Sequence, residues 1–172
     1  MHKKLDRKFF ERTTLRVAKE LLGKFLVRRI GDTVIAVKIT ETEAYCGPYD
    51  LACHASKGLT ARTKVMFGPP GHAYVYLIYG MYHCLNVVTE RDGYPAAVLI
   101  RAVELDGADG PGKLCRKLSI DKKLNAADLT SSQELWVEDR GNSVRPSDIK
   151  KSPRVGVDYA GSWKDKLWRF WV

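Results

Sequence analysis

The residues most capable of chemistry are two glutamates near the end of a predicted strand. The segment from Val34 to about Tyr45 alternates in hydropathy with a period of two, which is typical of a β-strand. On that alternation, Glu41 and Glu43 share one face with three aliphatic residues, Ile35, Val37 and Ile39. A carboxylate in this position is either paired with a cation, for which Arg101 is a candidate, or held at the mouth of a cleft. The pattern alone leaves both interpretations open.

Aromatic residues follow these glutamates along the chain and could form a pocket. Tyr45 stands two residues after the second glutamate, and His54 lies in a loop without acidic residues. Tyr74 and Tyr76 share one face of another predicted strand, Ala73–Ile78. Alternating tyrosines usually pack in a core, but each buried hydroxyl needs a hydrogen-bond partner. Their polar edges therefore also suit a pocket wall that stacks a flat ring.

Three further positions could serve such a pocket, and each also has an ordinary structural explanation. A turn that exposes Tyr79 and Met81 has the form of an apolar wedge that enters the minor groove of DNA. Asn86 lies in the following strand, where a single asparagine commonly completes a hydrogen-bond network. Arg101 interrupts an apolar strand and needs an anion nearby, either a phosphate or one of two carboxylates, Glu43 and Glu104.

The distribution of charge favours a nucleic-acid partner. The chain has 172 residues and a formal net charge of +9. No Asp or Glu occurs from Leu51 to Thr89, whereas Lys57, Arg62 and Lys64 are present there. Missing carboxylates together with clustered aromatics suit a surface that faces phosphates and bases. The alternative is that the stretch is largely a buried strand in an ordinary basic protein.

The elements that position these residues indicate a single α+β domain over residues 1–172, with a mainly antiparallel sheet. Thr13 or Thr14 can cap a helix that Gly23 ends, and Pro111 suits the first turn of a helix to Leu118. A short helix is expected around Leu124–Leu129. The remaining strands are expected at Phe25–Arg28, Leu85–Thr89, Ala96–Val103, Leu135–Glu138 and Leu167–Val172.

Several function classes are disfavoured. The longest uncharged run is broken by Gly, Pro, His and Asn, and the basic N-terminus lacks an apolar signal core, so a membrane or secreted protein is not expected. The four cysteines include no C-x-x-C pair, which argues against zinc and favours free thiols in a reducing cytoplasm.

Three long segments resemble the alkyladenine (3-methyladenine) DNA glycosylase family. They are ETEAYCGPYDLACH (41–54), MFGPPGHAYVYLIYGMYHCLNVVT (66–89) and AAVLIRAVE (96–104). GPGKLCRKLSID (110–121) and PRVGVDYAG (153–161) are similar to later landmarks of the family, in the same order. The resemblance covers the chain from about Leu15 to the C-terminus. The loop Ser56–Lys64 departs from the vertebrate pattern, and the chain resembles a compact microbial member.

The resemblance implies a function and a role for each matching residue. It implies a monofunctional glycosylase of base excision repair that flips damaged purines out of duplex DNA and hydrolyses the N-glycosidic bond without metal or cofactor. Glu43 matches the general base, and Tyr79 matches the residue that fills the gap in the helix. The flipped base is implied to contact Tyr45, His54, Tyr76, Asn86 and Arg101.

The family also implies a curved sheet with flanking helices, a protruding hairpin that inserts into DNA, and a monomer that acts in the cytoplasm, at the nucleoid of a prokaryote. Contacts with the DNA backbone are expected from Lys57, Arg62 and Lys64. The main alternative is a nucleic-acid-binding module in which Glu43 is only an ion-pair partner. A metal-dependent nuclease is disfavoured, because it needs clustered carboxylates and residues 51–89 have none.

Overall fold

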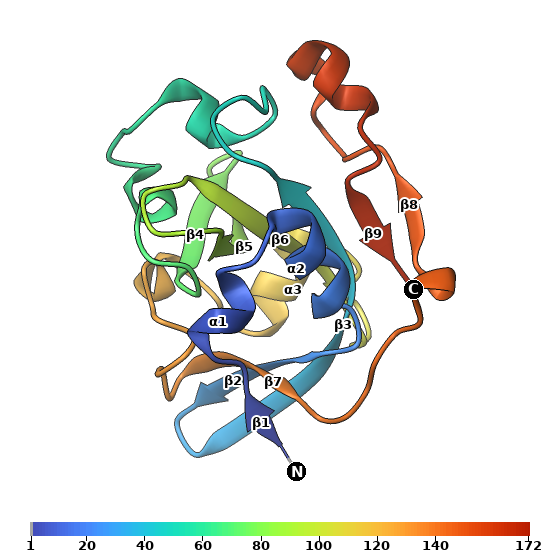
Figure 1. Cartoon of the computed structure of the whole chain (residues 1–172). Coiled ribbons are helices and arrows are strands. Elements are labelled where there is room, and N and C mark those ends of the chain that lie inside the picture. The colour runs from blue at the N-terminus through green and yellow to red at the C-terminus, as the bar shows by residue number, and fades with distance from the viewer. Residues whose placement is uncertain (1) are drawn as a thin grey trace.

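A curved antiparallel sheet forms the frame of the molecule (Figure 1). The computed structural model describes residues 2–172. The strands follow the order β1-β7-β2-β3-β6-β5-β4, and β9 pairs with both β3 and β8. Their bounds are β1 Lys3–Lys4, β2 Phe25–Ile30, β3 Thr33–Tyr45, β4 Ala73–Ile78, β5 Tyr82–Thr89, β6 Ala96–Val103, β7 Leu135–Asp139, β8 Lys150–Ser152 and β9 Arg169–Trp171. The predicted α+β class and the single compact domain are confirmed.

Short helices cover the sheet and complete one main core. They are α1 (Arg7–Phe10), α2 (Thr14–Leu21) and α3 (Pro111–Lys117). Leu21 of α2 and Leu114 of α3 are fully buried in the same cluster as Ile100 of β6. Five 3₁₀ helices lie in the loops between the described elements, at His54–Lys57, Lys64–Phe67, Lys122–Leu124, Pro146–Asp148 and Asp158–Asp165.

At the N-terminus of α2, a residue distant in the sequence accepts the hydrogen bonds that the expected N-cap does not. Thr13 is the N-cap residue, as expected, but its side chain makes no capping bond. The backbone N–H and hydroxyl of Thr14 instead donate to the carboxylate of Glu90, at 2.7 and 2.8 Å. The helix ends at Leu21, just before Gly23, whose φ of +81° suits glycine.

A break in the register of β3 places Glu43 on the face of the sheet opposite to the one predicted. Pairing of β3 with β6 shifts between Ile39 and Glu41 and again between Glu41 and Thr42. Because of this β-bulge, Thr42 faces the core beside α2, where its hydroxyl donates to Ala18 O at 2.8 Å. The prediction that Glu41 and Glu43 continue the face of Ile39 is therefore wrong. The bulge turns the glutamates to the opposite side of the sheet.

Two other expectations meet different outcomes. The helix expected at Leu124–Leu129 is reduced to one 3₁₀ turn, Lys122–Leu124, because the following segment pairs with β4. Ala126 N–H donates to Ala73 O and Ala127 O accepts from Ala73 N–H, both at 2.8 Å. The expectation of free thiols holds, since all four cysteines are unpaired.

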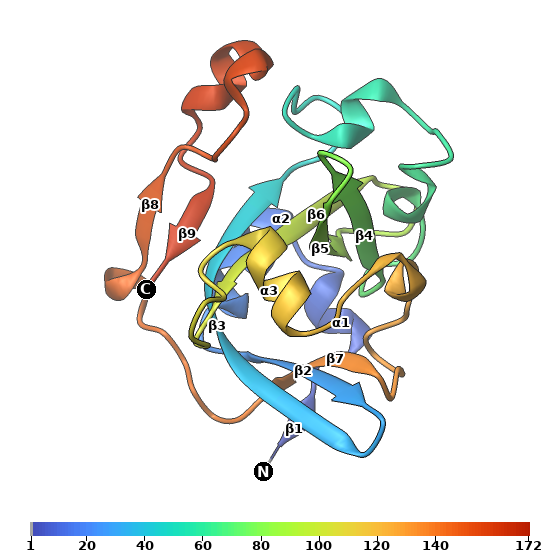
Figure 2. The same cartoon turned by 180° about the vertical axis from the view of Figure 1, so that it is seen from behind.

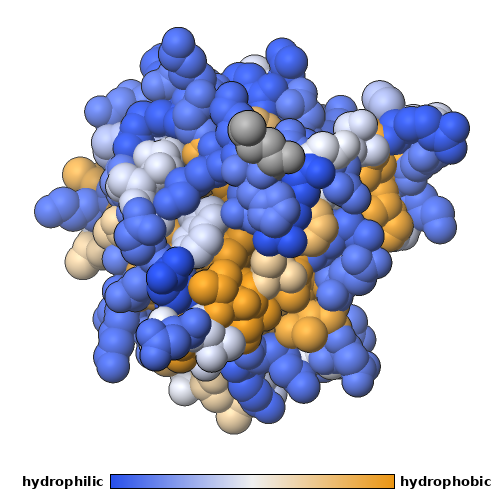
Figure 3. All heavy atoms as spheres, turned by 90° about the horizontal axis from the view of Figure 1, so that it is seen from below, coloured by the Kyte–Doolittle hydropathy of each residue, from blue (hydrophilic) through white to orange (hydrophobic). Residues whose placement is uncertain are grey.

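The C-terminal segment lies along the outer side of β3, as both ribbon views show (Figure 2). Strand β9 pairs with Glu41–Glu43 of β3, so the C-terminal segment lies beside the two glutamates. The face seen from below in Figure 3 is mostly hydrophilic, with a hydrophobic patch at its centre and smaller hydrophobic areas near its edges. None of the helices in residues 2–172 is long and apolar enough to cross a bilayer.

Candidate active site

A cavity with a volume of about 650 Å³ opens on the side of the sheet opposite the main core. Such a volume is typical of small-molecule pockets. Alternation along β4, β5 and β6 explains the lining, since Val75, Leu85 and Ile100 face the core while their neighbours face the cavity. The polar and aromatic lining residues include Tyr45, His54, Tyr74, Tyr76, Tyr79, Tyr82, Cys84, Asn86, Arg101, Lys113 and Tyr159.

Glu43 lies directly behind the wall of this cavity and has no exposed surface (0%). One carboxylate oxygen, Oε1, accepts the backbone N–H of Val155 at 2.8 Å. The other, Oε2, accepts the hydroxyl of Tyr45 at 2.7 Å. Burial raises the pKa of Glu43, and this rise is opposed by Arg101, by the two hydrogen bonds and by Arg154. A buried carboxyl with a raised pKa beside a cavity is typical of an acid–base group.

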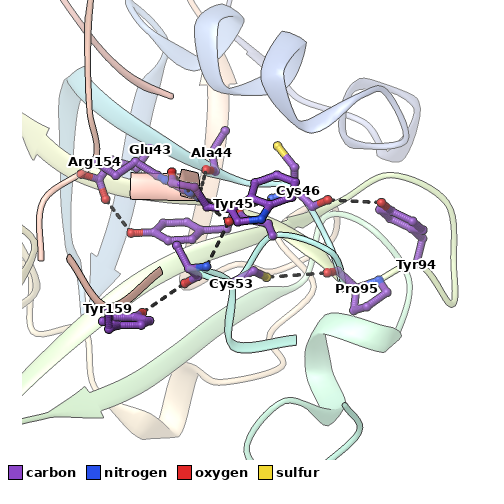
Figure 4. Close-up of polar contacts among 12 residues, drawn as sticks. Glu43, Ala44, Tyr45, Cys46, Cys53, Tyr94, Pro95, Arg154 and Tyr159 are labelled. Carbon is purple, nitrogen blue, oxygen red and sulfur yellow. Dashed lines mark hydrogen bonds and ion pairs between the residues drawn. The ribbon is translucent and has the colours of Figure 1, made fainter. Parts of the chain in front are cut away.

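Tyr45 joins the glutamate to the cavity. Its ring lines the cavity while its hydroxyl points to Glu43 (Figure 4). On the other side, the guanidinium of Arg154 lies 4.8 Å from the ring centroid. Burial raises the pKa of the Tyr45 phenol well above its usual value, so the hydroxyl is a hydrogen-bond donor at neutral pH.

A cluster of three rings forms another part of the wall. His54 Nδ1 and the Tyr74 hydroxyl are 3.0 Å apart, and the rings of His54 and Tyr76 are 4.6 Å apart at 69°. Burial, together with Arg62, lowers the pKa of His54 to about 4, so the imidazole is neutral at physiological pH. The sequence therefore grouped Tyr45, His54 and Tyr76 correctly around one cavity.

Asn86 and Arg101 also reach the site, from the middle of the sheet. Asn86 is buried, lines the cavity and donates from Nδ2 to Tyr74 O at 3.2 Å. Arg101 Nε donates to Glu41 Oε1 at 3.0 Å, and its Nη1 lies 3.5 Å from Glu43 Oε1. The anions that balance Arg101 are thus these two glutamates, whereas Glu104 pairs with Lys38 instead.

The hairpin between β4 and β5 carries an exposed aromatic tip. Tyr79 is 84% exposed and Met81 is 65% exposed. Both central residues of the Ile78–Met81 turn have positive φ, +53° for Tyr79 and +68° for Gly80. This combination is typical of type I′ turns, which favour Asn-Gly and disfavour a bulky first residue. The strained, exposed tyrosine therefore indicates a role outside folding.

The three basic residues expected to contact the DNA backbone are all exposed, and they lie on the segment that flanks the cavity. Lys57 and Lys64 lie on the 3₁₀ helices that also hold His54 and Met66, two residues of the lining. The guanidinium of Arg62 lies 4.9 Å from the centroid of the Tyr76 ring. In residues 2–172, no group of three or more His, Cys, Asp or Glu side chains is placed to hold a metal ion.

Comparison with known proteins assigns the chain to a family. A family model described as methylpurine-DNA glycosylase matches residues 8–172. The chain belongs to the methylpurine-DNA glycosylase family. The resemblance found in the sequence is confirmed, and the enzyme is a DNA glycosylase, a hydrolase that acts on N-glycosyl bonds.

Relatives from three microorganisms cover nearly the whole glycosylase. A protein of Methanocella arvoryzae is 56% identical over 97% of this chain and 91% of its own length. Proteins of Legionella pneumophila (strain Lens) and Myxococcus xanthus are 54% and 50% identical, over 99% and 98% of this chain and 94% and 89% of their own lengths. All three are named as candidate 3-methyladenine DNA glycosylases.

Sequence reasoning missed the residues that hold Glu43 from behind. Val155 and Arg154 belong to one of the segments that resemble the glycosylase family, but no local pattern assigned them a role. Arg154 pairs with Asp50, which is 104 positions away in the chain. A contact of that separation has no signal in periodicity or spacing.

Proposed function

We propose that this glycosylase flips damaged purines out of duplex DNA into the aromatic cavity and hydrolyses the N-glycosidic bond with a water activated by Glu43. The observation that carries the proposal is a buried carboxylate directly behind a cavity walled by aromatic rings. A base inside a duplex cannot reach a hydrolytic site, so the nucleotide must rotate out, at a cost of a few kcal/mol. We further propose that one copy suffices, since one chain supplies every site residue, and that it acts where the chromosome lies, in the cytoplasm at the nucleoid of a prokaryote.

The cavity suits a flat, electron-poor ring. Tyr45, His54 and Tyr76 present ring faces and edges, and stacking contributes about 1–3 kcal/mol per base contact. A cationic alkylated purine gains further from the electron-rich tyrosine faces. The neutral state of His54 adds no repulsion against such a cation. These features support alkylated purines as substrates, with hypoxanthine and ethenoadenine as neutral candidates.

In the proposed reaction, the bond from C1′ to the base breaks through an oxocarbenium-like state. A water bound by the Glu43 carboxylate adds to C1′, one of its protons passes to that carboxylate, and the base departs with the bonding electrons. Lys113 lines the cavity but is exposed and ion-paired with Asp109 at 2.9 Å, so it is not a poised amine nucleophile. The expected product is an abasic site without strand cleavage.

Excision is expected to decline as the pH falls. Burial raises the pKa of Glu43, and only the ionised carboxylate can take the water's proton. Activity is therefore full above the folded pKa of Glu43 and is lost as the pH drops through it. His54, with a pKa of about 4, stays neutral over most of this range. Single-turnover rates on a hypoxanthine duplex between pH 4.5 and 8 measure the effect. A flat profile would contradict the assignment of the base.

Replacing Tyr79 by asparagine is expected to reduce excision from duplex DNA about tenfold or more, the equivalent of one lost stacking contact. Asparagine tolerates positive φ better than tyrosine, so thermal stability should be unchanged or slightly higher. A single-stranded lesion oligonucleotide has no gap to fill and serves as the control. An equal loss on both substrates would argue against insertion of Tyr79 into the helix.

The proposed function is tested with a duplex oligonucleotide that carries a single ethenoadenine or hypoxanthine, under single-turnover conditions. Release of the base followed by alkali-sensitive strand breakage is expected. Borohydride should trap no covalent adduct, and a trapped adduct that disappears in Lys113→Ala would replace the water mechanism. Tight binding of both duplexes without release of either base would instead support the binding-module alternative.

A further inference from the structure

A buried ion pair behind the site joins two segments that are far apart in the sequence. Arg154 and Asp50 contact through two parallel hydrogen bonds, Nη1 to Oδ2 at 2.5 Å and Nη2 to Oδ1 at 2.9 Å. Neither side chain has any exposed surface (0% for each). A fully buried pair is a weak source of net stability, because desolvation offsets most of the attraction. Its position relative to the site therefore calls for another explanation.

The guanidinium of Arg154 contacts the site's own strand as well as Asp50. Nη1 also donates to Ala44 O at 2.9 Å, between Glu43 and Tyr45, as Figure 4 shows. Nη2 donates to Trp163 O at 3.2 Å, and the guanidinium carbon lies 4.8 Å from the Tyr45 ring centroid. Arg154 thus fixes the end of β3 and supports the face of Tyr45 that is turned away from the cavity.

Each partner holds a segment that brings one group to the site. Asp50 Oδ2 accepts the N–H of Cys46 and Oδ1 accepts that of Ala52, both at 3.1 Å, which fixes the loop leading to His54. Arg154 directly precedes Val155, whose N–H binds Glu43. Strand β3, the loop before His54 and the C-terminal segment therefore converge on one ion pair.

We infer that the Asp50–Arg154 pair is a positioning element that assembles the active site, by holding Val155 N–H on Glu43 and the Tyr45 ring against the cavity. This inference rests on the proposed role of Glu43. Loss of the pair releases the stretch at Arg154 and Val155 from the end of β3, so Glu43 loses the Val155 hydrogen bond and the Arg154 guanidinium moves away from it. Both interactions favour the ionised carboxylate, so their loss shifts the active form to higher pH.

Other groups that face Glu43 bear on this pH dependence. Arg101 reaches it from β6 and Tyr45 from its own strand, and Cys84 of β5 is near enough to interact electrostatically. Arg169 of β9 is its register partner, but its guanidinium pairs with Glu41. The variants below leave these groups in place.

The test compares Asp50→Asn with wild type and with Asp128→Asn as a matched control. Asp128 forms a partly buried ion pair with Arg7, at 2.5 Å, across a similar separation of 121 residues and does not line the cavity. For each folded variant, the affinity for an ethenoadenine duplex and the single-turnover rate against pH are measured. Asp50→Glu keeps the charge and serves as the rescue variant.

Asp50→Asn should bind the lesion duplex within about threefold of wild type and cleave it at least about tenfold more slowly at neutral pH, with an acid limb about one unit higher. Asp128→Asn should keep the wild-type profile, and Asp50→Glu should recover part of the rate. If Asp50→Asn does not fold, Arg154→Lys takes its place with the same expectation. A folded Asp50→Asn or Arg154→Lys variant with the wild-type rate and pH profile would overturn the inference. A slower rate whose decline at low pH occurs at the same pH as in the wild type would also overturn it. Inactive wild-type enzyme would instead refute the proposed function.

Discussion

Glu43→Gln is expected to bind lesion duplexes like the wild type but to excise the base about 10²–10⁴-fold more slowly, the usual contribution of a general base. The amide has nearly the shape of the carboxylate, so its oxygen can still accept the Val155 N–H. It cannot take a proton from water or offset positive charge on the sugar. Single-turnover excision and equilibrium binding, measured on the same ethenoadenine duplex, separate the two effects.

Glu41→Gln is the matched control for this variant. Glu41 lies on the same strand and contacts the same arginine, with Arg101 Nε at 3.0 Å from its Oε1, but it makes no bond to Tyr45 or Val155. A much smaller loss of rate is expected. Normal turnover by Glu43→Gln would remove the glutamate from the mechanism, and equal losses in both variants would reduce its role to balancing Arg101.

Phe170→Ala is expected to lower the free energy of unfolding by about 3–5 kcal/mol, the usual range for a buried phenylalanine. Phe170 is 1% exposed, lies in the main core and pairs in register with Thr42 of β3. Its loss leaves a cavity where β9 anchors the C-terminal segment. Denaturant unfolding measures the change, with Leu167→Ala, at a position 53% exposed, as a control expected to cost under about 1 kcal/mol. A comparable loss in both variants would contradict this anchoring role.

Local patterns in the sequence were enough to predict most of the strands. The apolar runs Ala73–Ile78 and Ala96–Val103 match β4 and β6 residue for residue, and a period of two correctly places Tyr74 and Tyr76 on one face of β4. The same reasoning failed across the bulge in β3, since an extra residue reverses the phase and nothing local marks it. The helix expected near Leu124 does not form beyond one turn, because strand β4 makes hydrogen bonds with the backbone of that segment.

Several residues that line the cavity were predictable from the sequence, but their arrangement was not. Tyr45, His54, Tyr76, Asn86 and Arg101 were all named from the sequence, and each lines one cavity. The complete burial of Glu43 behind Tyr45 depends on a backbone N–H 112 residues away, and no spacing rule encodes that contact. The proposed roles came from the resemblance to a known family, whereas physical patterns alone left open that Glu43 is only a structural ion-pair partner.

The most direct test of the central claim is the release of free 3-methyladenine from methylated duplex DNA by the wild-type protein, with the released base identified by chromatography. We expect free base and abasic sites in equal amounts, with no strand breaks before alkali treatment. Intact methylated DNA, recovered from a protein that binds it and remains folded, would contradict the proposed glycosylase activity.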